Sequence, residues 1–224
     1  MATPPVAPDA VLFDWDLTLV DNWRAIHNAL NAAQEGMGHE PWTLAQTRAR
    51  VRESMRDSFP RMFGERWTEA RDIFFDAFRA HHLAGLRPLP GAEAALRALR
   101  DEGCYLGVVS NKQGDFLRAE IAHLGWGDLF RAVVGAADAP RDKPARDPVD
   151  LALSAGGPAP GPNVWFVGDA GIDMACARAA GCLAVLIGGA DPAAAEFAAA
   201  PPVHHVADFA NLLVLVRGAQ MTIS

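Results

Sequence analysis

Cysteine and lysine are scarce in this chain of 224 residues, and long apolar runs are missing. The three cysteines are odd in number and form no C-x-x-C pair, so neither a disulfide framework nor a zinc knuckle is indicated. We expect Cys104, Cys176 and Cys182 to be small core residues in a reducing compartment. No stretch approaches the roughly 20 apolar residues that a membrane-spanning helix needs.

Positive charge is limited as well, which argues against nucleic acid as a partner. The formal net charge is -7 at pH 7, whereas a nucleic-acid surface needs clustered positive charge. The sequence MATPPVAPDA lacks the positive start of a signal peptide, so we expect a cytoplasmic protein with no membrane partner. A G-x-x-x-x-G-K-[ST] phosphate loop is missing too, which sets aside P-loop kinases and nucleotidases.

Short apolar runs predict the strands of one sheet. Runs that are apolar throughout suit parallel strands with helices on both faces, and helical patterns lie between these runs. The sequence therefore predicts an α/β fold whose core is a doubly wound, Rossmann-like parallel sheet. The predicted strands are AVLFDWD (10–16), CYLGVVSN (104–111), RAVVGAAD (131–138), VWFVGDA (164–170) and LAVLIGG (183–189).

Residues 22–87 depart from this alternation, because their apolar residues recur at helical spacing and no buried-strand run occurs. We therefore expect an all-helical insertion at 22–87 in a core formed by residues 1–21 and 88–224. The insertion holds ten arginines against eight acidic residues, so it is basic in an acidic chain. The Ala-rich stretch at 193–202 predicts a surface helix.

Carboxylates follow the predicted strands at the point where each strand ends. Asp14 and Asp16 lie at the end of the run at 10–16, with Thr18 just after them, and Asp169 lies at the end of the run at 164–170, with Asp173 one helical turn further on. Ligands of parallel α/β sheets gather beyond the carboxyl ends of the strands. An all-oxygen set without a nearby histidine suits Mg²⁺ better than zinc.

Two lysines are the second feature of these segments. Lys112 follows Ser110 and Asn111 at the end of the second run, and Lys143 lies in a later loop, whereas the chain has eighteen arginines elsewhere. A compact ammonium suits a phosphate oxygen or a carboxylate beside a metal. Ser110 and Asn111 are open to a simpler interpretation as helix caps, and Lys112 to one as a solvated charge.

Four motifs occur in an order that resembles the haloacid dehalogenase-like hydrolases, and specifically their phosphatases with a helical cap after the first strand. Within that family, S-N-K and K-P-A-x-D-P are most similar to phosphoglycolate phosphatase-like members. The resemblance covers nearly the whole chain and is weakest across residues 22–87. The motifs are DWDLT (14–18), VVSNK (108–112), RDKPARDP (141–148) and VGDAGIDM (167–174).

The resemblance implies roles for these residues. Asp14 would attack phosphorus to form an aspartyl-phosphate, and Asp16 would protonate the leaving oxygen and later deprotonate water. Lys143 would be the third catalytic residue. The phosphate would be held by Ser110, Asn111 and Lys143. The implied ligands of Mg²⁺ are Asp14, the backbone carbonyl of Asp16, Asp169, and Asp173 directly or through water.

Two positions depart from the family pattern. Leu17 stands where many members have Gly, which could alter the geometry of the loop, and Ala170 stands where Ser or Thr is frequent, which would remove a hydrogen bond near the site. Members that hydrolyse carbon–halogen bonds lack the second aspartate of the first motif. Asp16 therefore favours phosphate chemistry.

The expected activity is Mg²⁺-dependent hydrolysis of a small phosphorylated metabolite that resembles phosphoglycolate. A phosphomutase of the same fold, a pyrophosphatase and a catalytically inert partner-binding protein stay open as alternatives. Arg52 and Arg56 could face an anionic substrate, or pair with Glu53, Asp57 or solvent. Aromatic residues of the insertion would also suit a homodimer contact. Two pairs of adjacent histidines lack metal-ligand spacing to any partner, so we expect them at surface or loop positions. They are His81 with His82 and His204 with His205.

Overall fold

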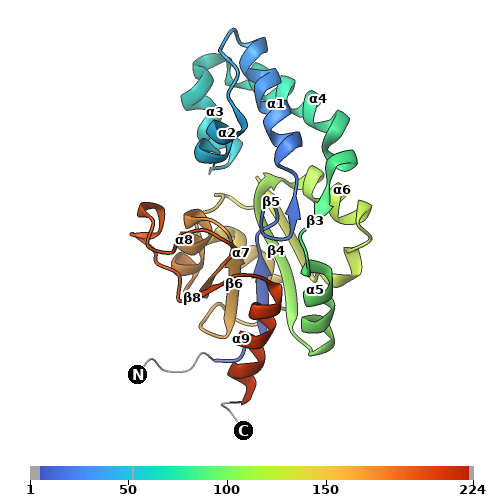
Figure 1. Cartoon of the computed structure of the whole chain (residues 1–224), viewed down its shortest axis with the longest axis vertical. Coiled ribbons are helices and arrows are strands. Elements are labelled where there is room, and N and C mark those ends of the chain that lie inside the picture. Colours follow the sequence, from blue (N-terminus) through green and yellow to red (C-terminus); the bar gives the residue numbers. More distant parts are fainter. Residues whose placement is uncertain (1–5, 52, 222–224) are drawn as a thin grey trace.

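A six-stranded sheet forms the centre of the structure, a computed structural model that describes residues 6–51 and 53–221 (Figure 1). The strands lie in the order β5-β4-β1-β6-β7-β8, and every neighbouring pair is parallel. Their bounds are Ala10–Phe13 (β1), Tyr105–Gln113 (β4), Ala132–Ala136 (β5), Val164–Gly168 (β6), Leu183–Ile187 (β7) and His204–Val206 (β8).

The order of the strands confirms the predicted doubly wound fold. From β1 the chain continues to β4 and β5 on one side, then crosses to β6, β7 and β8 on the other side. Such a reversal of strand order opens a crevice at the carboxyl ends of the strands beside β1. All five predicted runs form strands, and the edge strand β8 is an addition.

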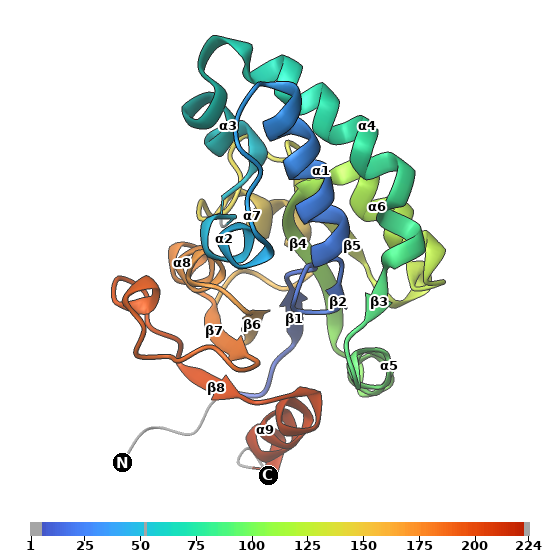
Figure 2. The same cartoon turned by 45° about the horizontal axis from the view of Figure 1, so that its top comes forward.

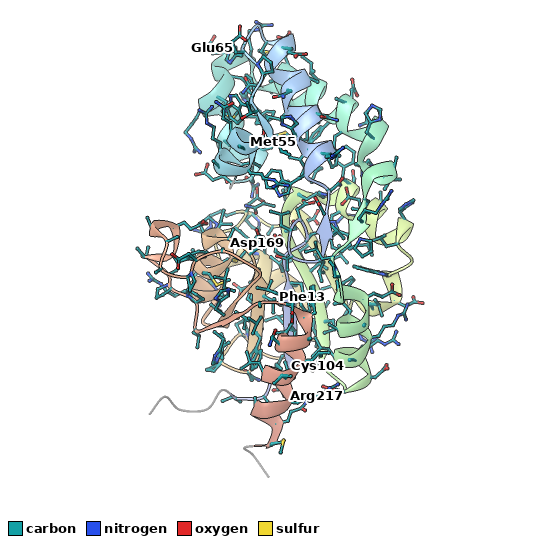
Figure 3. The ribbon with its side chains drawn as sticks, viewed as in Figure 1. Phe13, Met55, Glu65, Cys104, Asp169 and Arg217 are labelled. Carbon is teal, nitrogen blue, oxygen red and sulfur yellow. The ribbon has the colours of Figure 1, made fainter. Side chains whose placement is uncertain are left out.

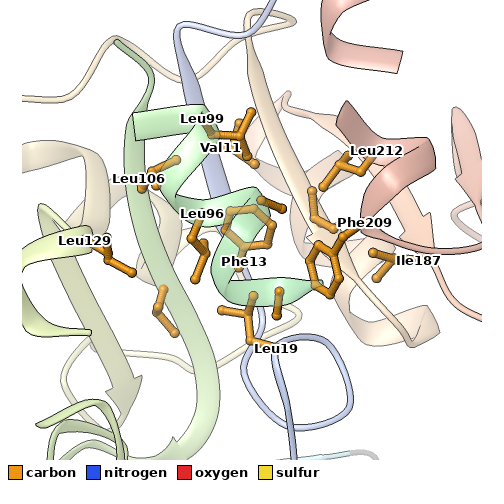
Figure 4. Close-up of a cluster of buried hydrophobic side chains, with 14 of the residues drawn as sticks. Val11, Phe13, Leu19, Leu96, Leu99, Leu106, Leu129, Ile187, Phe209 and Leu212 are labelled. Carbon is orange, nitrogen blue, oxygen red and sulfur yellow. The ribbon is translucent and has the colours of Figure 1, made fainter. Parts of the chain in front are cut away.

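Both faces of the sheet are covered, as the continuous apolar runs predict. Val11 and Phe13 of β1 point into one hydrophobic cluster, whereas Ala10 and Leu12 point into the other. Figure 4 shows the first cluster, in which Phe13 lies among side chains of α5 and α9. The helices of this face are α5 (Ala92–Asp101), α6 (Gly114–His123) and α9 (Phe209–Met221). The helices of the opposite face are α7 (Asp147–Ser154) and α8 (Gly171–Ala180).

The segment between β1 and α5 is helical, as its spacing predicts, and lies above the carboxyl ends of the strands (Figure 2). Apolar side chains of α1, α3 and α4, among them Leu30, Phe59 and Ala70, form a separate hydrophobic cluster. A second small cluster joins Ala25 and Phe78 of these helices to Phe116 of α6. The helices are α1 (Trp23–Gly36), α2 (Leu44–Arg50), α3 (Met55–Phe63) and α4 (Trp67–Gly85).

Two short antiparallel strands lie where the chain enters and leaves these helices. β2 (Val20–Asp21) pairs with β3 (Arg87–Pro88), so Val20 lies opposite Pro88. The two crossings between the sheet and the helices are thereby held side by side. Among the described helices, none has both the length and the apolar character that a membrane span requires.

The prediction of a surface helix at 193–202 is wrong. Only a 3-10 turn, η3 (Ala195–Phe197), forms there, and Phe197 is buried in the core cluster beside α8. The carboxylate of Asp191 accepts a hydrogen bond from the N–H of Ala193, which fixes a turn rather than a helix start. Alanine content alone does not make a helix when an anchoring side chain and two following prolines favour a compact turn.

Candidate active site

All residues predicted for the site line one cavity of about 660 Å³ between the strand ends and the inserted helices. Figure 3 shows Asp169 at the edge of the sheet and Met55 on the helices above it. The predicted site residues in the wall are Asp14, Asp16, Ser110, Asn111, Lys112, Lys143, Asp169 and Asp173.

A tight turn after β1 presents the first two carboxylates. Asp14 continues the sheet, since its N–H donates to the carbonyl of Val167, and the chain then folds back so that the N–H of Leu17 donates to the carbonyl of Val20. Leu17 adopts a φ of 64°, a left-handed conformation that costs a non-glycine residue about 1 kcal/mol. The departure at this position is therefore accommodated, because leucine takes the conformation that favours glycine.

Lys143 lies at the centre of the site and is almost fully buried. Its Nζ atom donates to Oδ1 of Asp14 and Oδ1 of Asp173, each at 2.7 Å. Burial alone lowers the pKa of Lys143, but the carboxylates of Asp14 and Asp173 outweigh burial, so the pKa is raised. The ammonium group is therefore charged at neutral pH and compensates part of the negative charge around it.

Three carboxylates converge beside this lysine. Asp14, Asp169 and Asp173 each offer an oxygen, and the three oxygens lie within 4.8 Å of one another. Asp169 also accepts a hydrogen bond from the buried hydroxyl of Thr18, at 3.3 Å. An all-carboxylate donor set of this kind fits a hard divalent cation, which would relieve the repulsion between the three groups.

Asp173 reaches this cluster because a glycine lies beneath it. A Cβ atom at Gly168 would lie 2.4 Å from Cβ of Asp173, so any larger residue at the end of β6 would displace the carboxylate. Oδ2 of Asp173 accepts the N–H of Ala170, and Oδ1 accepts Lys143. Burial is the main cause that raises the pKa of Asp173, to about 6.

The Asp16 carboxylate is directed toward Lys112 rather than toward the three clustered carboxylates. Nζ of Lys112 donates to Oδ1 of Asp16 at 2.7 Å. Burial raises the pKa of Asp16 to about 7, although Lys112 opposes the shift. Both protonation states of Asp16 are therefore populated near neutral pH, the condition that suits a group that gives and takes a proton.

Glu120 of α6 is a site residue that sequence reasoning missed. Its carboxylate is fully buried and accepts hydrogen bonds from Nε1 of Trp15, Nδ2 of Asn22 and Nζ of Lys112, at 2.6–2.8 Å. Nδ1 of His82 lies 2.9 Å from the same group. Lys112 thus bridges Glu120 and Asp16, and its pKa is raised because these two carboxylates outweigh the effect of burial.

Two simpler interpretations are wrong in this region. Lys112 is not a solvated charge, because only 5% of its side chain is exposed. His82 is not a surface residue, because it lies on the buried face of α4, stacked on Phe78. The helical spacing places His82 on the same face as Phe78 four residues earlier, and this is the signal that could have identified it.

Ser110 and Asn111 lie within β4 and do not cap α6, which begins at Gly114. Oγ of Ser110 accepts the N–H of Lys112, so its hydroxyl proton remains available to a ligand. Asn111 uses its side-chain amide on the main chain of Lys143, donating to the carbonyl at 3.1 Å and accepting the N–H at 3.0 Å. Asn111 therefore fixes the loop that presents Lys143.

Arg56 joins the inserted helices to the same loop. Nε and Nη2 of Arg56 contact the two carboxylate oxygens of Asp142, at 2.7 and 2.8 Å, and Asp142 directly precedes Lys143. The pair replaces the predicted partners Glu53 and Asp57. Arg52 lies outside the described residues.

The stability of the chelated protein should fall as the pH rises from 5 to 8, by about 4 kcal/mol in urea unfolding. The raised pKa values of Asp16 and Asp173 mean that the folded state binds more protons than the unfolded state in this range. Raising the pH therefore favours unfolding. Asp16→Asn should flatten this dependence, and a wild-type stability that does not change with pH would contradict the prediction.

Replacing Ala170 by Ser should stabilise the protein by about 0.5–1 kcal/mol. Ala170 precedes α8 in an extended conformation and has no side-chain oxygen that could accept a hydrogen bond from an N–H group of the first helical turn. It lines the cavity, which leaves room for a hydroxyl group. Urea unfolding measures the gain, and Ala119→Ser on the exposed face of α6 should give the opposite sign. Equal effects at both positions would refute the capping argument.

The sequence of this chain is similar to those of known phosphatases. The chain is 35% identical over 179 residues to a phosphoglycolate phosphatase of Cereibacter sphaeroides, an alignment that covers 76% of this chain and 81% of the relative. It is 29% identical over 213 residues to a phosphoglycolate phosphatase of Chromobacterium violaceum, covering 91% of this chain and 96% of the relative.

Solved structures share the fold of this chain, and a family model matches most of its length. A HAD-superfamily hydrolase from Ehrlichia chaffeensis superposes with a TM-score of 0.66 at 25% identity, covering 96% of this chain and 98% of the other. A haloacid dehalogenase-like family protein from Streptococcus pneumoniae shares the fold, with a TM-score of 0.79 at 22% identity, covering 93% and 97%. The model of the haloacid dehalogenase-like hydrolases matches residues 11–187. The chain therefore belongs to the haloacid dehalogenase-like hydrolase family.

Proposed function

We propose that this protein is a Mg²⁺-dependent phosphatase that hydrolyses a small phosphorylated metabolite through an aspartyl-phosphate intermediate. The observation that supports it most is the arrangement around Asp14. Its carboxylate lies 2.7 Å from Nζ of Lys143 and within 4.8 Å of carboxylate oxygens of Asp169 and Asp173. Asp16, whose pKa is about 7, is two residues away. A nucleophile, a charge-compensating group and a proton carrier thus line one cavity.

In the first half-reaction, an Asp14 carboxylate oxygen attacks phosphorus and the bond between phosphorus and the leaving oxygen breaks. The protonated form of Asp16 donates its proton to that oxygen, so the product leaves as a neutral alcohol. Lys112 and Glu120 hold the Asp16 side chain in place for this transfer.

In the second half-reaction, Asp16 is ionised and takes a proton from a water molecule as that water attacks the phosphorus atom. The acyl-phosphate bond to Asp14 breaks, inorganic phosphate forms and Asp16 is again protonated. A pKa of about 7 suits both steps, because neither protonation state is strongly disfavoured at neutral pH.

The positive and donor groups of the core would bind the phosphoryl oxygens. The Ser110 hydroxyl has a proton to donate, and Lys143 has three N–H donors, of which two contact carboxylates. Asn111 acts as a positioning residue, because both of its amide atoms engage the main chain of Lys143.

The metal ion that suits this donor set is Mg²⁺. Asp14 and Asp169 would bind it directly, with the backbone carbonyl of Asp16, whereas Asp173 would act through water because both of its oxygens already accept hydrogen bonds. When bound, Mg²⁺ supplies positive charge that neutralises phosphoryl oxygens and the carboxylate cluster.

Because the relatives from Cereibacter sphaeroides and Chromobacterium violaceum are phosphoglycolate phosphatases, phosphoglycolate is the reference substrate. We propose that residues 22–87 serve as a helical cap on a core of residues 1–21 and 88–224, with β2 and β3 at the two crossings. The three free, buried cysteines support a cytoplasmic location.

The test is phosphate release from a panel of phosphorylated metabolites that begins with phosphoglycolate, with Mg²⁺ and with a chelator. We expect release that Mg²⁺ supports and the chelator abolishes. Isomerisation of a sugar phosphate without net phosphate release would instead identify a phosphomutase. Metal-independent release would overturn the assignment of the carboxylate cluster.

A further inference from the structure

The wall of the cavity that faces the strand ends is largely apolar. It is built by side chains of α1, α3, α4 and the loops between them, and several of these aromatic and thioether groups are half-buried. Half-buried side chains that line a cavity have apolar surface that a ligand can cover. The clearest examples are Trp42, Met55, Met62, Trp67, Phe74 and Phe75.

Two of the three arginines that line this wall are already engaged in ion pairs. Arg56 forms its ion pair with Asp142, and Arg71 pairs with Asp72 while its guanidinium lies over the ring of Trp67. Lys112, on the core side, is held by two carboxylates.

Arg50 is the remaining arginine in this part of the described wall. Its guanidinium lies over the Trp42 ring, 4.6 Å from the centroid, and no ion pair joins it to a described carboxylate. The wall therefore offers extended apolar surface and little free positive charge for a second anionic group.

The size of the cavity agrees with this composition. About 660 Å³ equals the liquid volume of roughly twenty water molecules. A two-carbon ester such as phosphoglycolate, bound at Asp14, would leave most of the apolar wall in contact with water. A ligand that covers the wall removes this apolar surface from water, which contributes favourably to its binding free energy.

We infer that the substrate is a phosphomonoester whose leaving alcohol has a bulky apolar part, preferably an aromatic ring, which packs against Met62, Trp67 and Phe75. This inference rests on the proposed phosphatase function. The phosphate group binds at Asp14 and Lys143, and the apolar part extends toward α3 and α4. The reaction is ester hydrolysis by water, with the alcohol and inorganic phosphate as products.

The test uses three primary alkyl phosphates that differ in apolar size: ethyl, 2-phenylethyl and 2-(2-naphthyl)ethyl phosphate. Their leaving alcohols have similar acidity, so a difference in kcat/KM reports contacts with the cavity. In the presence of Mg²⁺ we expect kcat/KM to rise at least about tenfold from the ethyl ester to the larger esters. Phosphoglycolate is measured beside them.

Variants of the wall test where the apolar part binds. Met62→Gln and Met55→Gln keep the side-chain length and should remove most of the preference for the larger esters. Met221→Gln, at the exposed end of α9 and 81% exposed, is the matched control and should leave the preference unchanged. Circular dichroism confirms that each variant is folded.

Acetyl phosphate, which is small and chemically activated, distinguishes failure of the apolar assignment from failure of the proposed phosphatase function. If it is hydrolysed and phosphoglycolate or ethyl phosphate equals the aromatic esters, the apolar assignment is wrong and the phosphatase function stands. The same conclusion follows if Met62→Gln and Met55→Gln keep the full preference. If neither acetyl phosphate nor any ester is hydrolysed, the proposed function fails and the inference fails with it.

Discussion

Replacing Asp14 by Asn should lower kcat for phosphate release by at least about 10³-fold, the largest effect expected of any single substitution. An amide is a poor nucleophile, and no other carboxylate takes the same position at the end of β1. Asp169 and Asp173 lie in the same cluster, but they follow β6, the strand next to β1. Binding of a phosphate ester should persist, because Ser110 and Lys143 are unchanged.

The variant should fold normally, which makes the loss of activity interpretable. Asn keeps the shape of the side chain, and Lys143 retains Asp173 as a charged partner at 2.7 Å. Asp128→Asn, at an exposed position in η2 (Gly127–Leu129), is the matched control and should keep full activity.

Acid quenching of the wild-type reaction with a phosphate-labelled ester should trap label on the protein, and Asp14→Asn should trap none. Labelled wild-type protein would establish the covalent step independently of the rate. A variant that releases phosphate at more than a tenth of the wild-type rate would exclude Asp14 as the nucleophile.

The sheet could be predicted because parallel strands covered on both faces must be apolar throughout. Runs such as those ending at Phe13 and Gly168 satisfy this requirement, and each is followed by carboxylates, which an interior position tolerates only when they are paired. The carboxyl ends of neighbouring parallel strands meet at one edge, so the same reasoning places Asp14 near Asp169. Local sequence thus contains much of the information about the core of the site.

The buried groups around Glu120, which hold Lys112 against Asp16, could not be predicted in this way. Glu120 is separated from Trp15 by 105 residues, and its place on α6 shows only that one face of the helix is buried. Because a glutamate is rarely fully buried, the sequence alone favours a solvent-exposed position for Glu120. Only the structure shows the four partners that allow its burial. The contact of His82 with Glu120 is hidden for a similar reason, because no metal-ligand spacing marks a histidine whose partner is a distant carboxylate.

The buried network also connects the inserted helices to the reacting groups. His82 comes from α4 and Asn22 from the entry to α1, and both contact the Glu120 carboxylate that holds Lys112 against Asp16. Burial of so many polar groups is stable only when each is paired. A change in the position of α4 would therefore alter the surroundings of Asp16.

Lys143→Met should destabilise the protein by about 3–5 kcal/mol and abolish activity, the second large effect. Lys143 is the ammonium group that compensates Asp14 and the fully buried Asp173. Methionine keeps the length of the side chain but leaves both carboxylates without that charge. Urea unfolding in the presence of a chelator measures the loss, because bound metal would mask part of it.

A second substitution separates loss of charge compensation from loss of packing. In Lys143→Met/Asp173→Asn, the more deeply buried of the two uncompensated charges is removed, so the double variant should recover at least half of the lost stability but no activity. Arg146→Met, three residues along, breaks an exposed ion pair with Asp150 and should cost less than about 1 kcal/mol. If the double variant were no more stable than Lys143→Met, packing rather than charge would be the reason for burying this lysine. Recovery would instead mean that the lysine is buried because the clustered carboxylates need a cation beside them. A compact ammonium fits between two carboxylates where a planar guanidinium does not, although the chain has eighteen arginines.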